Sequence, residues 1–261
     1  MQHHPRKRFG QHFLHDKNII DRIINVINPS PDQTIVEIGP GQGALTLPLL
    51  KRTGELHVVE IDRDLAQEIT TLGKTHGTVH MHCVDALEFD LKNISDKPIK
   101  VVGNLPYNIS TPLIFHLLGQ MDGISEMIFM LQEEVVDRLI AGPGSKTYGR
   151  LSVMVQSQCM VEKLFRVGHG AFKPPPKVGS AVVRLTPHHQ AIAEIKNHAA
   201  FTLIVRECFN QRRKVLRNAL RNLLTSEQIQ SLDIDPGLRP ERLTINQFAA
   251  LANYYHNHIN Q

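Results

Sequence analysis

The stretch Thr34-Ile-Val-Glu-Ile-Gly39-Pro-Gly41-Gln-Gly43-Ala44 decides the expected fold. An apolar run of strand length leads directly into three alternating glycines, and a helical pattern begins after them. Glycines allow a tight backbone turn to lie against a ligand. Strand, glycine turn and helix together predict the start of a βαβ unit with a ligand site at the end of its first strand.

Strands and helices alternate on both sides of this stretch. We expect an opening helix over 16–28, and helices after most of the strands that follow. The expected strands cover residues 34–38, 55–61, 79–84, 99–102, 127–131, 161–167 and 181–185. This alternation predicts a parallel sheet covered by helices. After Thr186 the pattern changes to helices only, expected at about 193–209, 213–223, 226–232 and 245–257.

The composition sets the broad class of protein. The chain has 261 residues, of which 41% are hydrophobic and 21% charged, which is typical of a globular protein and excludes disordered, fibrous and coiled-coil classes. The uncharged stretch 101–121 contains too many polar residues and prolines for a membrane span, and the N-terminus lacks a signal-peptide pattern. We therefore expect a cytoplasmic protein without a membrane segment. The scattered cysteines and the absence of a metal-binding motif predict no metal site.

Basic residues concentrate in two segments of a chain whose net charge is +4. Residues 6–8 are all basic, and residues 206–221 carry six basic side chains against the single acid Glu207. The six are Arg206, Arg212, Arg213, Lys214, Arg217 and Arg221. Dense basic patches on an otherwise mildly acidic body predict a polyanionic partner. A solvated helix face is the alternative for such a run taken alone.

Two carboxylates follow the second and third expected strands. Gly39-x-Gly41-x-x-Ala44 matches the dinucleotide pattern, and Glu60 stands about 20 residues further on, where a ribose-binding acid is expected. This pattern alone does not separate NAD from S-adenosylmethionine. Asp85 follows the next strand and is suited to accept a hydrogen bond from an adenine amine, with a helix cap as the alternative.

Asn104-Leu105-Pro106-Tyr107, at the end of the fourth strand, decides between these ligands. The lone pair of an aromatic amine is delocalised into its ring, so an enzyme that methylates it needs acceptors aimed at both N–H groups. The side-chain oxygen of Asn104 and a carbonyl of Leu105 or Pro106 supply two such acceptors. Pro106 stiffens the turn, and Tyr107 offers a face for base stacking. Taken alone, the motif also fits a plain proline turn.

Five motifs together resemble the ribosomal RNA adenine dimethyltransferases, and among them the small-subunit enzymes. They are Arg8-Phe-Gly-Gln-His-Phe-Leu14, Glu37-Ile-Gly-Pro-Gly-Gln-Gly43, Asn104-Leu-Pro-Tyr-Asn-Ile-Ser-Thr-Pro112, Ala171-Phe-Lys-Pro-Pro-Pro-Lys-Val178 and Phe209-Asn-Gln-Arg-Arg-Lys214. The resemblance implies an α/β, class I (Rossmann-like) methyltransferase domain with a seven-stranded, mostly parallel sheet over residues 1–187. A small helical RNA-binding domain would occupy 188–261.

The resemblance also assigns roles to single residues. It implies that S-adenosylmethionine contacts His12, Leu14, Gly39, Gly41, Gly43, Glu60, Asp85 and Asn104. The family usually has Asn where this chain has His12. It further implies that Phe172 lies opposite Tyr107 and sandwiches the target base, so that the catalytic group would be Asn104, Leu105, Pro106, Tyr107 and Phe172. On residue type alone, Phe172 is a packed loop residue.

The implied activity is dimethylation of two adjacent adenosines near the 3′ end of small-subunit (16S) rRNA during ribosome biogenesis. No heptad pattern or large apolar stripe in the sequence argues for a dimer, so we expect a monomer. Three alternatives stay open at this point. They are a large-subunit rRNA methyltransferase of the antibiotic-resistance type, a ribosome-assembly factor with dispensable catalysis, and an NAD oxidoreductase. The last leaves Asn104-Leu-Pro-Tyr107 unexplained.

Overall fold

The computed structural model describes residues 12–211 and 213–258. Its strands are β1 (Phe13–Leu14), β2 (Thr34–Ile38), β3 (Glu55–Val59), β4 (Thr78–His82), β5 (Ile99–Asn104), β6 (Ile124–Gln132), β7 (Cys159–Val167), β8 (Phe172–Lys173) and β9 (Ser180–Pro187). Its α-helices are α1 (Lys17–Ile27), α2 (Thr46–Thr53), α3 (Arg63–Gly73), α4 (Ser110–Leu118), α5 (Glu133–Leu139), α6 (Arg150–Gln156), α7 (His198–Asn210), α8 (Leu216–Ala219), α9 (Ser226–Gln230) and α10 (Ile245–His258).

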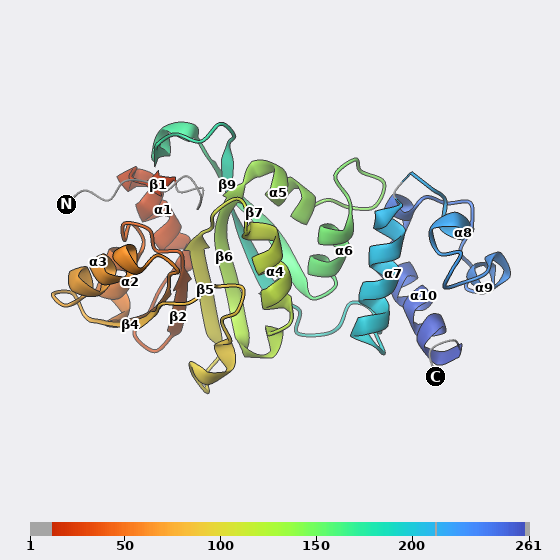
Figure 1. Cartoon of the computed structure of the whole chain (residues 1–261), viewed down its shortest axis with the longest axis horizontal. Helices are drawn as coiled ribbons and strands as arrows, with labels where there is room; N and C mark the ends of the chain where they lie inside the picture. The colour runs from red at the N-terminus through yellow and green to blue at the C-terminus, as the bar shows by residue number, and fades with distance from the viewer. Residues whose placement is uncertain (1–11, 212, 259–261) are drawn as a thin grey trace. The chain divides into compact units, whose positions relative to one another are not determined.

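Seven strands form one sheet in the order β4-β3-β2-β5-β6-β9-β7. Strands β4, β3, β2, β5 and β6 pair in parallel, and β9 runs antiparallel to β6. β2, β5 and β6 lie side by side in this order (Figure 1). The predicted seven-stranded, mostly parallel sheet is confirmed. The chain leaves β2 toward β3 on one side and reaches β5 on the other, and open α/β sheets bind ligands at such a switch point.

The central strands are apolar because the two faces of a parallel sheet are both covered. Four of the five residues of β2 are buried, and so are five of the six in β5. Helix α1 presents Ile23, Ile24 and Ile27 to the core cluster that includes Ile35 of β2. Asp16 begins this helix, since its carboxylate accepts hydrogen bonds from the N–H groups of the first turn. The predicted opening helix over 16–28 is therefore confirmed.

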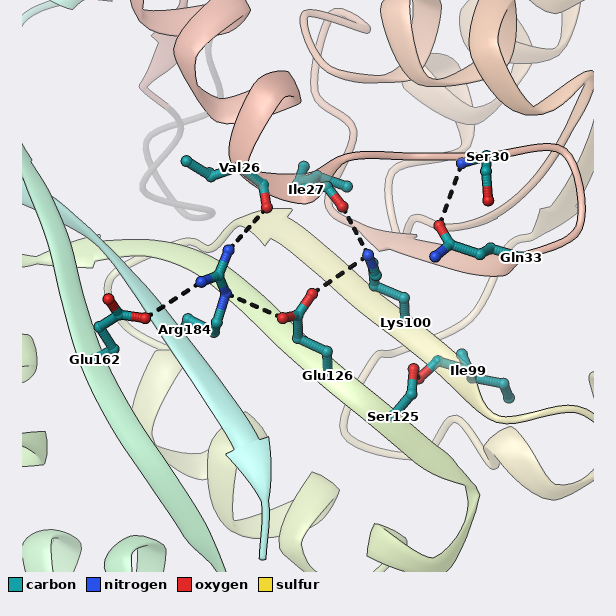
Figure 2. Close-up of polar contacts among 10 residues, drawn as sticks. All are labelled: Val26, Ile27, Ser30, Gln33, Ile99, Lys100, Ser125, Glu126, Glu162 and Arg184. Atoms are coloured by element: carbon teal, nitrogen blue, oxygen red, sulfur yellow. Dashed lines mark hydrogen bonds and ion pairs between the residues drawn. The ribbon is translucent and has the colours of Figure 1, made fainter.

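Charged side chains fix the C-terminal end of α1 to the sheet (Figure 2). Lys100 of β5 donates to the carbonyl of Ile27 over 2.6 Å. Arg184 of β9 donates to the carbonyl of Val26 over 3.0 Å. Glu126 of β6 lies between the two cations, 3.3 Å from Lys100 Nζ and 3.0 Å from Arg184 Nε. The two cations thus satisfy carbonyls that a helix leaves unpaired at its end, and Glu126 balances their charge.

The segment before α1 is held by the proline-rich segment. β1 pairs antiparallel with β8, which places Leu14 opposite Phe172. The His15 N–H donates to the Ala171 carbonyl over 2.9 Å. His12 Nδ1 lies 2.8 Å from the Pro174 carbonyl oxygen, so this ring nitrogen carries a proton and donates it. The two motifs, far apart in sequence, therefore form one small two-stranded sheet.

The chain forms two compact units. Unit 1 comprises the residues up to 136 together with 161–187, and it contains the cavity described below. Unit 2 comprises 137–160 together with the residues from 188 onward. The structure differs here from the boundary expected at residue 187, because α6 has a buried face and packs on α7. The assignment of methyl transfer to residues 1–187 and of RNA binding to residues 188–261 stays a prediction.

The basic run, residues 206–221, does not contain the helix that we expect over 213–223. Helix α7 ends at Asn210, a turn follows, and α8 is only a short helix over Leu216–Ala219. The turn closes with a 2.7 Å hydrogen bond from the Lys214 N–H to the Gln211 carbonyl. Within residues 12–211 and 213–258, no helix combines the length and the apolar character needed to cross a bilayer.

Candidate active site

A cavity of about 340 Å³ lies at the carboxyl ends of β2, β3 and β5, in unit 1. Five segments line it, namely residues 12–14, 37–45 apart from Gly43, 59–61, 84–86 and 104–109. The last four segments lie at the carboxyl ends of β2, β3, β4 and β5, in this order, and the one for β4 begins two residues past the strand. Parallel strands end at one edge of a sheet, so the topology alone brings these segments together.

The glycine turn forms one wall of this cavity. Gly39 and Gly41 have φ angles of +67° and +54°, which favour glycine. A Cβ atom on Gly41 would lie 3.1 Å from the ring of Phe13, so the N-terminal segment packs directly on the turn. Gly43 does not line the cavity, and a Cβ there would meet Ile69 and Leu72 of α3. Gly43 therefore allows the turn to pack closely against α3, and its expected contact with the cofactor stays a prediction.

Glu60 and Asp85 both line the cavity. Glu60 directly follows β3, and its Oε1 accepts a hydrogen bond from the Asp62 N–H over 2.9 Å. Its own N–H donates to the His82 carbonyl over 3.0 Å, which ties the residue to the end of β4. Asp85 Oδ1 accepts from the Leu87 N–H over 2.9 Å, so Asp85 also serves as the turn cap that its position allows. The two carboxylates are thus fixed by their own local turns.

Asn104 ends β5 with a defined amide orientation. Its Nδ2 donates to the main-chain carbonyl of His12 over 3.2 Å. A flipped amide would set two oxygen atoms against each other, so the contact with His12 leaves Oδ1 as the group available to a ligand. Leu105 is buried, and its N–H donates to the Met130 carbonyl over 3.2 Å. The Pro106 carbonyl accepts from the Ile109 N–H over 3.2 Å, which closes the turn.

Tyr107 stands at the rim of the cavity and is half-buried. Its hydroxyl lies 2.8 Å from Ser180 Oγ, and burial raises the pKa of the phenol above its usual value of 10.0. The His12 ring lies 5.6 Å from the Tyr107 ring, between centroids, at an interplanar angle of 33°. The phenol edge is therefore anchored, and His12 lies beside the ring.

Phe172 is buried in this structure and is not part of the cavity wall. Its side chain is 3% exposed, it belongs to the core cluster with Leu14, and it does not line the cavity. The physical reason is the pairing of β1 with β8, which sets residues 14 and 172 opposite each other on the apolar side. Phe172 is thus packed as its type alone indicates, and its expected place opposite Tyr107 around a target base stays a prediction.

Glu37 is a cavity residue that the sequence reasoning missed. It lies within β2, is 1% exposed and lines the cavity. Burial, together with the nearby Glu60 carboxylate, raises the pKa of Glu37 to about 7. The signal was a lone acid inside the apolar run 34–38, directly before the glycine turn. Ile61 and Val84 were also missed; they follow strand ends and give the cavity exposed apolar walls.

The predicted basic residues lie in unit 2, on α7 and after it. Arg206 is paired with Glu207 at 3.1 Å.

Arg213 lines a second cavity of about 300 Å³ together with Lys146 and Arg239. Lys214, Arg217 and Arg221 are exposed, whereas Arg212 and residues 6–8 lie outside the described residues. Lys146 and Arg239 were not predicted, because each stands alone in sequence and only the fold gathers them.

The strand order and the cavity at the switch point define a class I methyltransferase fold. The chain matches the family described as ribosomal RNA adenine dimethylase over residues 2–257, and it belongs to this family.

Relatives of known name match nearly the whole chain. The chain is 54% identical to the ribosomal RNA small subunit methyltransferase A of Nitrosococcus oceani, over 97% of each chain. It is 53% identical to the protein of the same name from Hahella chejuensis, over 98% of this chain and 94% of that one. A dimethyladenosine transferase from Plasmodium falciparum is similar in structure, with a TM-score of 0.81 at 25% identity over 94% of this chain and 98% of that chain. The 23S rRNA methyltransferase ErmE shares the fold, with a TM-score of 0.71 at 24% identity over 94% and 99%.

Proposed function

We propose that this protein transfers methyl groups from S-adenosylmethionine to N6 of two adjacent adenosines in the 3′-terminal hairpin loop of small-subunit (16S) rRNA. Family membership supports a ribosomal adenine as the substrate, and the names of the relatives favour the small subunit over the large one. The structural observation that carries the proposal is the Asn104 amide, whose nitrogen is held by the His12 carbonyl and whose oxygen is left for the cavity.

The cavity fits S-adenosylmethionine in size and in polar groups. Its volume of about 340 Å³ lies within the range of about 300–1,000 Å³ that is typical of small-molecule sites. We assign Glu60 to the ribose hydroxyls and Asp85 to the adenine amine, with residues 39–41 and 12–14 against the rest of the molecule. When bound, the cofactor supplies an activated methyl group.

Asn104 and Leu105 activate the target amine. The amine has two N–H groups. When two protein oxygen atoms accept hydrogen bonds from both of them, the lone pair is drawn back from the ring to the nitrogen. Asn104 Oδ1 is one acceptor. Of the two carbonyls considered from the sequence, that of Pro106 already accepts the Ile109 N–H, so we assign the second acceptor to Leu105. The amine is neutral and releases a proton only after transfer, so Asp85 has a binding role and is not a general base.

Tyr107 holds the target base. A base splayed out of a hairpin loop can stack on an aromatic face, which contributes about 1–3 kcal/mol. The Tyr107 ring lines the cavity beside Asn104, so a base stacked on it has its amine within the same site. Holding the reactants in this arrangement is the main catalytic contribution that we assign to the protein.

The basic residues of unit 2 are the proposed grip on rRNA phosphates. Neutralising Arg212, Arg213 and Lys214 together is expected to weaken binding and to flatten its salt dependence, because each phosphate that a cation neutralises on a duplex adds about 0.9 to the slope. Binding to small subunits is measured between low and moderate salt. A triple variant of exposed lysines in unit 1, Lys51, Lys74 and Lys97 to Gln, removes the same charge and serves as the control. An equal slope for the wild type and the basic-run variant would refute this assignment.

We further propose that the protein works in the cytoplasm as a monomer, with the small ribosomal subunit as its partner. The proposed substrate, a ribosomal particle, supports the location and the partner, and the sequence carries no heptad pattern that argues for a dimer.

The proposal is tested by incubating the purified protein with labelled S-adenosylmethionine and small subunits that lack the modification, then digesting the RNA and identifying the labelled nucleoside. The expected product is N6,N6-dimethyladenosine, at four methyl groups per particle. Label confined to large-subunit RNA would assign the protein to the resistance-type enzymes. Binding to the particle without transfer to either RNA would favour an assembly factor.

A further inference from the structure

Tyr107 is tied to a distant, fully buried residue by its hydroxyl. The phenol oxygen lies 2.8 Å from Ser180 Oγ. Ser180 is 1% exposed and is the first residue of β9, whereas Tyr107 lies in the turn after β5. β6 stands between β5 and β9 in the sheet, so the contact reaches across one strand. The stronger acid of the two hydroxyls is the phenol, and we assign it as the donor.

Ser180 is a rigid anchor. It pairs with Gln132 in the ladder between β6 and β9. The preceding carbonyl, of Gly179, accepts the Glu133 N–H over 2.9 Å. The Glu133 carboxylate is in turn bound by Lys163 at 2.9 Å and by Arg166. Ser180 is therefore held by the ladder with β6, which continues one residue further through the main chain of Glu133.

The hydrogen bond to Ser180 is made by the phenol oxygen, at the edge of the Tyr107 ring, so it does not itself cover either face of the ring. Turns after strands are more mobile than the strands themselves, and an untethered aromatic ring changes its tilt by rotating about its side-chain bonds. A second contact fixes the backbone of this residue, since Ser110 Oγ donates to the Tyr107 carbonyl over 3.1 Å. With both ends held, the plane of the ring is set before a base arrives.

We propose that Ser180 is a positioning residue for the target base, because its hydroxyl fixes the plane of the Tyr107 ring on which the base stacks. This inference rests on the proposed function, in which Tyr107 carries the base. Ser180 does not touch the reacting atoms; it acts only through Tyr107. Phenylalanine at position 107 would offer the same face for stacking, and the hydrogen bond to Ser180 gives a reason for tyrosine there.

The test is a double-mutant cycle with Ser180→Ala, Tyr107→Phe and both together. Each single variant removes the same hydrogen bond, so each is expected to raise KM for small subunits and to lower kcat/KM about 3- to 10-fold. The double variant is expected to be no worse than either single one. Affinity for S-adenosylmethionine, measured by calorimetry, is expected to stay unchanged, because neither hydroxyl is assigned to the cofactor.

Ser157→Ala is the matched control, since it removes a buried hydroxyl that donates to the Met154 carbonyl in unit 2. A loss of Tm alone, equal for Ser180→Ala and Ser157→Ala and without a change in KM, would overturn the proposal. Losses in kcat/KM that multiply in the double variant would overturn it as well.

Tyr107→Phe leaves the core intact and tests the hydrogen bond even if Ser180→Ala fails to fold. A wild-type protein that transfers no methyl groups would refute the proposed function, whereas an active wild type with an unaffected Tyr107→Phe would refute only the role of Ser180.

Discussion

Asn104→Ala is expected to lower the rate of methyl transfer about 10²- to 10³-fold, while the affinity for S-adenosylmethionine changes by no more than a few-fold. Removing a preorganised hydrogen-bonding group that acts on the reacting atoms typically has an effect of this size. The truncated side chain takes away the acceptor oxygen that the His12 carbonyl orients. The cavity keeps Glu60 and Asp85, which we assign to the cofactor.

The measurement is a single-turnover transfer of label to unmodified small subunits at saturating cofactor, with cofactor affinity from calorimetry. Asn25→Ala removes an amide from α1, away from the cavity, and is the control. Asn104→Asp keeps an acceptor but sets a carboxylate oxygen against the His12 carbonyl, so we expect a large loss here too. Transfer by Asn104→Ala within threefold of the wild type would contradict the assigned role.

The parts of the site that the sequence predicted are those that depend on local pattern. Asn104 ends a strand that is recognisable from its apolar run, Glu60 and Asp85 come just after two others, and parallel strands end at one edge of the sheet. Knowing that the strands are parallel was therefore enough to place these three side chains around one cavity. The boundaries of β2 follow the same logic, since the glycine turn ends the strand at Ile38.

Other features of the structure depend on packing between distant segments. Phe172 is set by the pairing of β8 with β1, which no local pattern in the proline segment reveals. Gly43 faces α3 because of the way that helix returns along the sheet. The helix expected over 213–223 is reduced to the short α8, because the turn closed by Lys214 and Gln211 takes up its start. For Phe172 and Gly43, tertiary packing decides a feature that neighbouring residues do not reveal.

Glu37 shows how burial changes the meaning of a residue type. In sequence it is one acid in a strand, but in the fold its carboxyl is enclosed at the cavity with Glu60 nearby. Burial then raises the pKa of Glu37 from 4.5 to about 7, so the folded protein without cofactor keeps this carboxyl protonated over much of the range in which a free glutamate ionises. Such a group weakens the fold as the pH rises.

Glu37→Gln is expected to raise the free energy of unfolding at pH 8 by about 3 kcal/mol in the absence of cofactor, and to change it little at pH 4.5. The wild-type contribution is fully present below the unfolded pKa of 4.5 and is lost as the pH rises through about 7. A shift of this size corresponds to about 3 kcal/mol. Urea unfolding at a series of pH values measures it, with Glu68→Gln, an exposed change on α3, as the control.

The same substitution is expected to weaken cofactor binding, which separates function from stability at this position. S-adenosylmethionine is a cation overall, so its binding favours ionised Glu37. The wild-type Kd is therefore expected to fall about tenfold for each unit by which the pH rises toward 7, and to level off above it. Glu37→Gln has no proton to release, and its Kd is expected to be higher at pH 8 and nearly independent of pH. A pH-dependent Kd that persists in Glu37→Gln would show that another group titrates with binding. The expected result, a variant that is more stable but binds S-adenosylmethionine less tightly, would mean that the buried Glu37 carboxyl serves ligand binding and lowers the stability of the fold.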